Sequence, residues 1–158
     1  MRKFERISFD QFIKDVKDDR MLYDSIELPK RSTKASAGYD IKSVEEGIIK
    51  PGEAKIFKTG LKVSMNTDEV LNIYSRSGHG YKYNICLVNS VGVIDSDYYN
   101  NTDNEGHFSI KLINLGDKDF EVNIGDKIAQ GIFMKYLTVD DEDIIDNERN
   151  GGIGSTGK

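Results

Sequence analysis

The chain has little of what several classes of protein require. It has one cysteine in 158 residues, Cys86, so no disulfide can form within it. Cys86 stands in the apolar run Ile85–Val88, and we expect it to be a small buried hydrophobe in a reducing compartment. No run approaches the roughly 20 apolar residues of a membrane-spanning helix, and Met1–Arg6 lacks the apolar core of a secretory signal. These absences exclude a disulfide scaffold, predict no membrane partner and indicate a cytoplasmic protein.

Positive charge is not in excess either. The 22 Lys and Arg residues are outnumbered by 27 Asp and Glu residues, which gives a net charge of −5. A protein that binds a nucleic-acid polymer usually carries a basic stripe, so this partner is excluded. A single nucleotide is not, because a few local donors and a metal ion suffice to bind it.

The clearest helix signal lies in residues 1–21, which we interpret as an accessory helical segment. Ser8 and Gln11 fit a capping box, with Ile7 and Phe12 placed to pack across the cap. An apolar face follows at helical spacing, formed by Phe9, Phe12, Ile13 and Val16. Such a face either packs on its own domain, which we expect, or binds a partner.

Residues 22–138 change to short apolar or alternating runs separated by glycines and other turn residues. With only two prolines in the chain, this pattern predicts an all-β sandwich or barrel. The expected strands are Ile48-Ile49, Ala54–Phe57, Leu61–Met65, Val70–Tyr74, Ile85–Val88, Phe108–Leu115, Phe120–Val122 and Ile128–Met134. A polar loop, Asn100–Gly106, interrupts them.

Residues 139–158 form an acidic linker and a glycine-rich arm. Gly151–Lys158 holds four glycines, two hydroxyls and a lysine, which suits phosphate oxygens. A P-loop needs a helix to follow, and we expect none after these residues. The arm is therefore either a frayed end or a flexible lid over a phosphorylated ligand held by other residues.

Four further segments carry chemistry, although each has a plain alternative. Asp40 begins a strand and is by itself a turn carboxylate. Arg76-Ser77-Gly78 offers a guanidinium, a hydroxyl and an exposed N–H to phosphate, or is a simple turn. Asp95 follows an apolar pair and is either a general base or a turn residue. Gln130 is the polar exception in an apolar strand.

In this order and spacing, the five segments resemble the five motifs of the trimeric dUTPases, over about Leu28 to Lys158. The resemblance implies a jelly-roll-like β domain with a flexible C-terminal arm, to which the predicted N-terminal helix is an addition. It implies a homotrimer with three sites between subunits, each covered by the arm of another subunit. The implied reaction is cleavage of dUTP to dUMP and pyrophosphate, with Mg²⁺ on the triphosphate.

The resemblance also implies a role for each matching residue. Asp95 corresponds to the carboxylate that deprotonates the attacking water, and Asp40 to an acid that supports Mg²⁺ through water. The residues that correspond to nucleoside contacts are Asn89, Gly92, Val93, Ile94, Tyr98 and Ile153. Those that correspond to phosphate contacts are Arg76, Ser77, Gly78, Gln130, Arg149, Gly154, Ser155 and Thr156.

Some positions depart from the family pattern. Ile153 replaces a phenylalanine that stacks on uracil in many relatives, and Asn100 replaces a glycine at the start of what looks like an insertion. Asparagine tolerates positive φ, so we expect the turn at Asn100 to survive. His79 and His107 are expected to have surface or turn roles.

Two other functions stay open at this point. One is a dCTP deaminase of the same fold. The other is an additional regulatory role, in which the N-terminal helix or the Asn100–Gly106 loop binds a protein partner.

Overall fold

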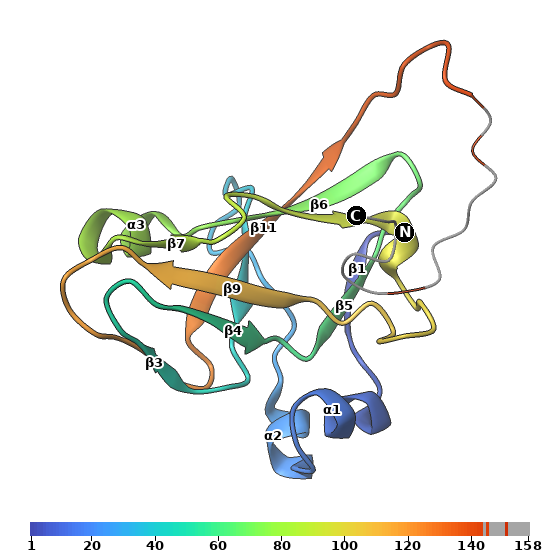
Figure 1. Cartoon of the computed structure of the whole chain (residues 1–158). Helices are drawn as coiled ribbons and strands as arrows, with labels where there is room; N and C mark the ends of the chain where they lie inside the picture. Colours follow the sequence, from blue (N-terminus) through green and yellow to red (C-terminus); the bar gives the residue numbers. More distant parts are fainter. Residues whose placement is uncertain (144, 146–150, 152–158) are drawn as a thin grey trace.

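The computed structural model describes residues 1–143, 145 and 151 and shows two packed β layers (Figure 1). One layer is a four-stranded sheet in the order β2 (Tyr39–Lys42), β11 (Lys127–Lys135), β6 (Glu69–Tyr74) and β8 (Gly92–Asp95). The other has the order β4 (Ala54–Lys58), β9 (Ser109–Asn114) and β7 (Ile85–Leu87). All these pairs are antiparallel. The predicted all-β, jelly-roll-like fold is confirmed.

Two further pairs extend the layers. β1 (Lys3–Arg6) pairs with β5 (Leu61–Ser64), and β10 (Phe120–Val122) pairs with β3 (Gly47–Ile49). The first pair joins the N-terminus to the body of the domain, and Phe4 is buried against the main core.

Alternation along the strands creates that core. In β9, Ile110, Leu112 and Asn114 point inward, and they are at most 2% exposed. Leu71 and Ile73 of β6 face them from the other layer as part of the same apolar cluster. Since side chains alternate between the two faces of a strand, the inward set fixes which residues face solvent and are free for binding.

Cys86 shows the same rule. Ile85 and Leu87 are buried, whereas Cys86 between them is a half-buried free thiol on the opposite face of β7. The expectation of a buried Cys86 was wrong, because only one face of this apolar strand packs into the core.

Helix α1 (Phe9–Asp15) begins where the sequence predicts, with the Ser8 hydroxyl accepting from the Gln11 N–H at 3.1 Å. Ile7 and Phe12 are fully buried in a small cluster with Leu22 of α2 (Arg20–Ser25). Two details differ: Ile13 is 38% exposed, and the Ser8 N–H donates to Glu105 rather than to Gln11. The helix therefore packs on its own chain. Residues 1–21 also contain β1, and position 21 lies within α2.

The expected strands were confirmed to within about two residues, whereas β1, β8, α2 and the helix α3 (Ser77–Tyr83) were not predicted. The 3₁₀ turn η1 (Ser96–Tyr98) follows β8 directly. None of the helices in the described residues combines the length and apolarity needed to span a membrane.

Candidate functional site

A cavity of about 570 Å³ opens between β8 and β9. The residues that line it include the predicted base and the predicted nucleoside contacts of the described chain: Asn89, Gly92, Val93, Ile94, Asp95 and Tyr98. The structure therefore brings these six residues together. The apolar floor, which includes Phe108 and Ile110 of the β9 segment, was not predicted to belong to the site.

The turn between β7 and β8 forms one wall of this cavity. It is tight: Ser90 has a φ of +61°, and the Val91 N–H donates to the Asn89 carbonyl at 2.6 Å. Gly92 enters β8 opposite Ile73, where a Cβ at position 92 would lie 3.2 Å from the Ile73 Cβ. The Asn89 side chain is exposed at the tip. A turn of this kind presents a rigid backbone edge to a planar ligand.

Tyr98 closes the cavity from η1 and is only 6% exposed. Its hydroxyl donates to the His107 carbonyl at 3.3 Å and accepts from the Asn104 amide at 2.9 Å. Asp95, by contrast, is exposed at the start of η1. The pair thus combines a fixed aromatic ring with an accessible carboxylate.

A second cluster of predicted residues forms where β2, β11 and β6 meet. Gln130 of β11 lies opposite Asp40 on one side and Tyr74 on the other. Its amide donates to the Ser75 carbonyl at 3.1 Å. The Arg76 Nε lies 3.8 Å from the Asp40 carboxylate, and Ser77 and Gly78 follow as the first residues of α3.

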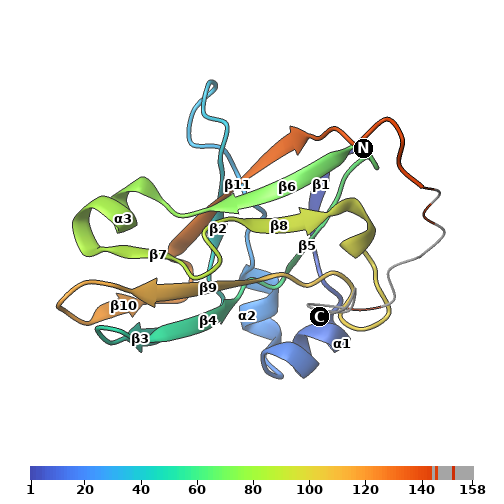
Figure 2. The ribbon, with the colours of Figure 1, turned by 45° about the horizontal axis from the view of Figure 1, so that its top comes forward.

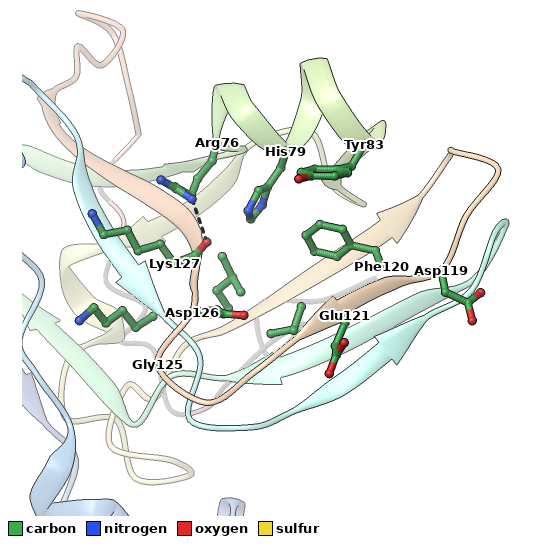
Figure 3. A pocket seen from close by; sticks show the side chains of 12 residues that line it. Arg76, His79, Tyr83, Asp119, Phe120, Glu121, Gly125, Asp126 and Lys127 are labelled. Atoms are coloured by element: carbon green, nitrogen blue, oxygen red, sulfur yellow. Dashed lines mark hydrogen bonds between the residues drawn. The ribbon is translucent and has the colours of Figure 1, made fainter.

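Lys127 is a member of this cluster that sequence reasoning missed. Its Nζ lies 2.6 Å from the Asp40 carboxylate, and its carbonyl accepts from Arg76 at 3.3 Å (Figure 3). Burial opposes ionisation of Asp40, but hydrogen bonds from Lys127 and Ser32 and the nearby positive charges outweigh it, so the pKa of Asp40 is lowered. The cluster is a charged, donor-rich surface suited to anionic oxygens.

Arg76 and Lys127 also border a cavity of about 610 Å³ that contains His79, Tyr83 and Phe120 (Figure 3). The His79 ring packs against Phe120 with ring centroids 5.1 Å apart. Burial first, and the positive charge of Arg76 second, lower the pKa of His79. His79 is thus half-buried in an aromatic wall. The His107 side chain, by contrast, is buried, so the expectation of a surface role was wrong for it.

The two clusters lie toward opposite ends of β6. Asp95 pairs with Val70 at one end, and Gln130 pairs with Tyr74 at the other. Arg76 lies six residues beyond Val70, which corresponds to roughly 20 Å along a strand. Within one chain, Asp95 and Arg76 therefore do not face one another across a ligand-sized gap.

The remaining predicted site residues, Arg149, Ile153, Gly154, Ser155 and Thr156, lie outside the described residues. The geometry of the arm is therefore not part of the site described above.

Comparison with known proteins decides the family. The family model of dUTPase matches residues 24–157. The chain belongs to the dUTPase family. It is 50% identical over 133 residues to deoxyuridine 5'-triphosphate nucleotidohydrolase from Lactococcus lactis, covering 84% of this dUTPase and 89% of that relative. The corresponding protein of Helicobacter pylori strain Shi470 is 36% identical over 134 residues, with 82% and 88% covered.

Solved structures agree with the fold of this dUTPase. The dUTPase from Streptococcus mutans superposes with a TM-score of 0.72 at 39% identity, covering 87% of this chain and 98% of that one. A mutant dUTPase from phage phi11 of S. aureus superposes with a TM-score of 0.69 at 22% identity. The match covers 91% of this chain and 96% of that one, and it supports the shared fold. This dUTPase is therefore a dUTP nucleotidohydrolase, and a dCTP deaminase is not favoured.

Proposed function

We propose that this dUTPase hydrolyses dUTP at sites shared between copies of the chain, arranged as a homotrimer. The observation that carries this proposal is the register of β6, which separates Asp95 from Arg76. A dUTP molecule needs a nucleoside contact and phosphate contacts at the same time. A neighbouring copy supplies the second half when two surfaces related by rotation meet.

The cavity between β8 and β9 is the nucleoside half. Asn89 and the backbone of Gly92–Ile94 hydrogen-bond the edge of uracil, and the tight turn leaves no room for the methyl group of thymine. Losing a methyl contact changes affinity little, so steric exclusion by a rigid backbone is the stronger discriminator. The Tyr98 ring packs under the deoxyribose and excludes a ribose 2′-hydroxyl.

Asp95 acts at the α-phosphate. It orients a water molecule and accepts its proton as the water oxygen bonds to the α-phosphorus. The bond from that phosphorus to the bridging oxygen breaks, and pyrophosphate leaves. An in-line attack of this kind depends mainly on position and on charge stabilisation, which the exposed carboxylate beside a fixed ring supports.

The second cluster is the phosphate half. Arg76, Ser77, Gly78 and Gln130 bind the phosphate oxygens, and Asp40 orients Arg76 and Lys127 through its two contacts. From a third copy, the arm residues Arg149, Ile153, Gly154, Ser155 and Thr156 close over the nucleotide, with Ile153 covering uracil by apolar contact. Closure excludes water once the substrate is bound.

Mg²⁺ fits this donor set as an ion carried by the triphosphate. Among the residues that the structure describes, no three His, Cys, Asp or Glu side chains gather into a cation site. Mg²⁺ often keeps its waters and binds through one or two carboxylates plus substrate phosphates. Asp40, engaged with Lys127, would hold such an ion through water, and the ion would neutralise the developing phosphate charge.

Asp95→Asn tests the assignment of the base. An amide cannot accept the proton from water, so we expect kcat to fall by about 10²–10⁴-fold while the Kd for a non-hydrolysable dUTP analogue changes little. Pyrophosphate release and calorimetry measure the two quantities. Asp97→Asn, two residues away on η1, is the matched control. Normal turnover in Asp95→Asn would refute the assignment, and parallel assays with dTTP, UTP and dCTP check the substrate.

A further inference from the structure

We propose that Asn104 and His107 are positioning residues for Tyr98, and that helix α1 supports the nucleoside half of the site through Asp15. The inference rests on the proposed role of Tyr98 as the ring under the deoxyribose. It assigns a function to the polar loop Asn100–Gly106 and to the N-terminal helix, neither of which takes part in the reaction described above. Figure 2 shows this loop, in yellow after β8, descending from η1 toward α1.

The first step is the contact between Asn104 and the Tyr98 hydroxyl. One amide group of Asn104 donates to the Tyr98 oxygen at 2.9 Å and to the His107 carbonyl at 3.2 Å. Its oxygen accepts from the Asn101 amide at 2.9 Å and from the Gly106 N–H at 3.0 Å. Because a backbone N–H can only donate, the orientation of the amide is fixed. The Tyr98 hydroxyl also donates to the His107 carbonyl, so it is fixed both as a hydrogen-bond acceptor and as a hydrogen-bond donor.

The second step leads from Tyr98 to the N-terminal helix. His107 is 3% exposed, and its Nε2 accepts from the Gly60 N–H at 3.0 Å. This contact requires a neutral ring with its proton on Nδ1, which donates to the Asp15 carboxylate at 2.5 Å. The carbonyl of the same residue contacts Tyr98. A continuous set of hydrogen bonds thus runs from α1 to the predicted sugar-binding ring.

The third step is the attachment of the loop itself. Glu105 accepts from the backbone N–H and the hydroxyl of Ser8, and from Lys62 at 3.1 Å. Tyr99, which follows Tyr98, donates to Glu5 of β1. Asn100 adopts the expected left-handed conformation, with a φ of +57°, and its side chain also accepts from Lys62. The loop is therefore held from both ends by the N-terminal segment and β5.

Rigid support matters because Tyr98 is proposed to reject a 2′-hydroxyl by occupying space. A ring that is free to tilt would admit UTP, whereas a ring fixed at its hydroxyl would not. Positioning groups of this kind act within fractions of an ångström. The expected signature is a loss of discrimination between dUTP and UTP, which a purely structural role would not cause.

The test measures kcat/KM for dUTP and for UTP, together with the melting temperature, in full-length variants. We expect Asn104→Ala to lower the dUTP/UTP ratio about tenfold and Asp15→Ala to lower it about threefold, on the scale of one lost hydrogen bond. Asn123→Ala and Asp18→Ala are matched controls of the same residue types, exposed and outside the loop, and we expect no change in them. If Asn104→Ala fails to fold, the dUTP/UTP ratio of Asp15→Ala tests the proposal instead, and an unchanged ratio would overturn it.

A double-mutant cycle gives the sharpest result. Tyr98→Phe keeps the ring but removes the hydroxyl that Asn104 contacts, so adding Asn104→Ala to it should cost little more discrimination. Full additivity, or a lower melting temperature with an unchanged dUTP/UTP ratio, would overturn the positioning role alone. Unchanged discrimination in Tyr98→Ala would overturn the proposed role of Tyr98, and this inference with it.

Discussion

His107 is the residue whose protonation the fold opposes most directly. Its Nε2 already accepts from Gly60, so a second proton on the ring would break that contact. Burial, the largest effect, lowers the pKa of His107 below its ordinary value of 6.5, against an opposite effect from Asp15. The unfolded chain therefore binds this proton more readily than the folded chain.

The sign of the pH dependence follows. Stability should be flat above about pH 7 and should fall as the pH drops below 6.5, because protons then favour the unfolded chain. His79, the only other histidine of the sequence, has a pKa lowered by burial and acts in the same direction. Urea midpoints between pH 5 and 8 should show this slope, and His107→Gln and His79→Gln should each reduce it. An unchanged slope in both variants would contradict the prediction.

Gly106 provides a second prediction at this scale. Its φ is +84°, and a Cβ there would lie 2.5 Å from the Tyr98 carbonyl oxygen. Gly106→Ala should cost about 1–2 kcal/mol for the left-handed backbone and about 1–3 kcal/mol more for overpacking, measured by urea unfolding. Gly52, with a φ of +79° and nothing within 4 Å of a Cβ, is the matched control. Equal losses in the two variants would show that the contact with Tyr98 has no cost.

Single residues also mark the limit of what could be predicted from the sequence. The order and spacing of short motifs made four site residues predictable: Asp95, Tyr98, Arg76 and Gln130. Asn104 and Asp15 were not predictable, because their importance comes from contacts made in space. Asp15 and His107 are 92 positions apart, and no local pattern links residues at such a separation.

Among the elements, α1 shows how one residue can serve two purposes. Ser8 caps the helix and also holds Glu105 through its N–H and hydroxyl. Asp19 caps α2 by accepting from the Leu22 N–H at 2.9 Å. Ser8 therefore connects a helix to the loop beside the cavity between β8 and β9, whereas Asp19 acts locally.

Replacing the two caps should separate these roles. Each change to alanine should cost about 1 kcal/mol of unfolding free energy for the lost cap. Ser8→Ala should also lose the hydroxyl contact with Glu105, and so destabilise more and raise the KM for dUTP, while Asp19→Ala should leave the KM unchanged. Chemical unfolding and steady-state kinetics measure both. A raised KM in Asp19→Ala alone would contradict this division.

The elements were predictable to the degree that their patterns were strong. Alternating apolar strands such as β6 and β9 were found, and so was the cap of α1. β1 was missed because Lys3–Arg6 has one apolar residue among three charged ones. α3 was missed because its two glycines, Gly78 and Gly80, indicate a turn. The tertiary structure, in which this segment connects β6 to β7, determines that α3 is helical, because the helix propensity of its residues is low.

At the scale of the whole molecule, the separation of Asp95 from Arg76 makes a quantitative prediction. Asp95→Asn copies keep a sound phosphate half, and Arg76→Ala copies keep a sound nucleoside half. If the halves of one site come from different copies, refolding an equal mixture should restore about one quarter of the sites by random assembly. Each variant alone should stay inactive.

Complementation is measured as pyrophosphate release after co-refolding, with unmixed variants refolded in parallel. Wild-type protein mixed with either variant is the control for recovery. No recovery in a mixture that forms trimers by native mass would show that one chain supplies both halves.

Three expectations from the sequence stay predictions. They are the division into residues 1–21, 22–138 and 139–158, the cytoplasmic location of the protein, and a regulatory protein partner.

The pairing of β1 with β5 has a consequence for how the protein is made. Lys3–Arg6 of β1 find their partners only when Leu61–Ser64 have been synthesised. Likewise, Asp15 can contact His107, and Ser8 can contact Glu105, only after those later residues have been synthesised. Because these contacts are distant in the sequence, their formation is slow. The segment that holds β1 and α1 is therefore among the last to acquire its native contacts, in the same step that fixes the Asn100–Gly106 loop beside Tyr98.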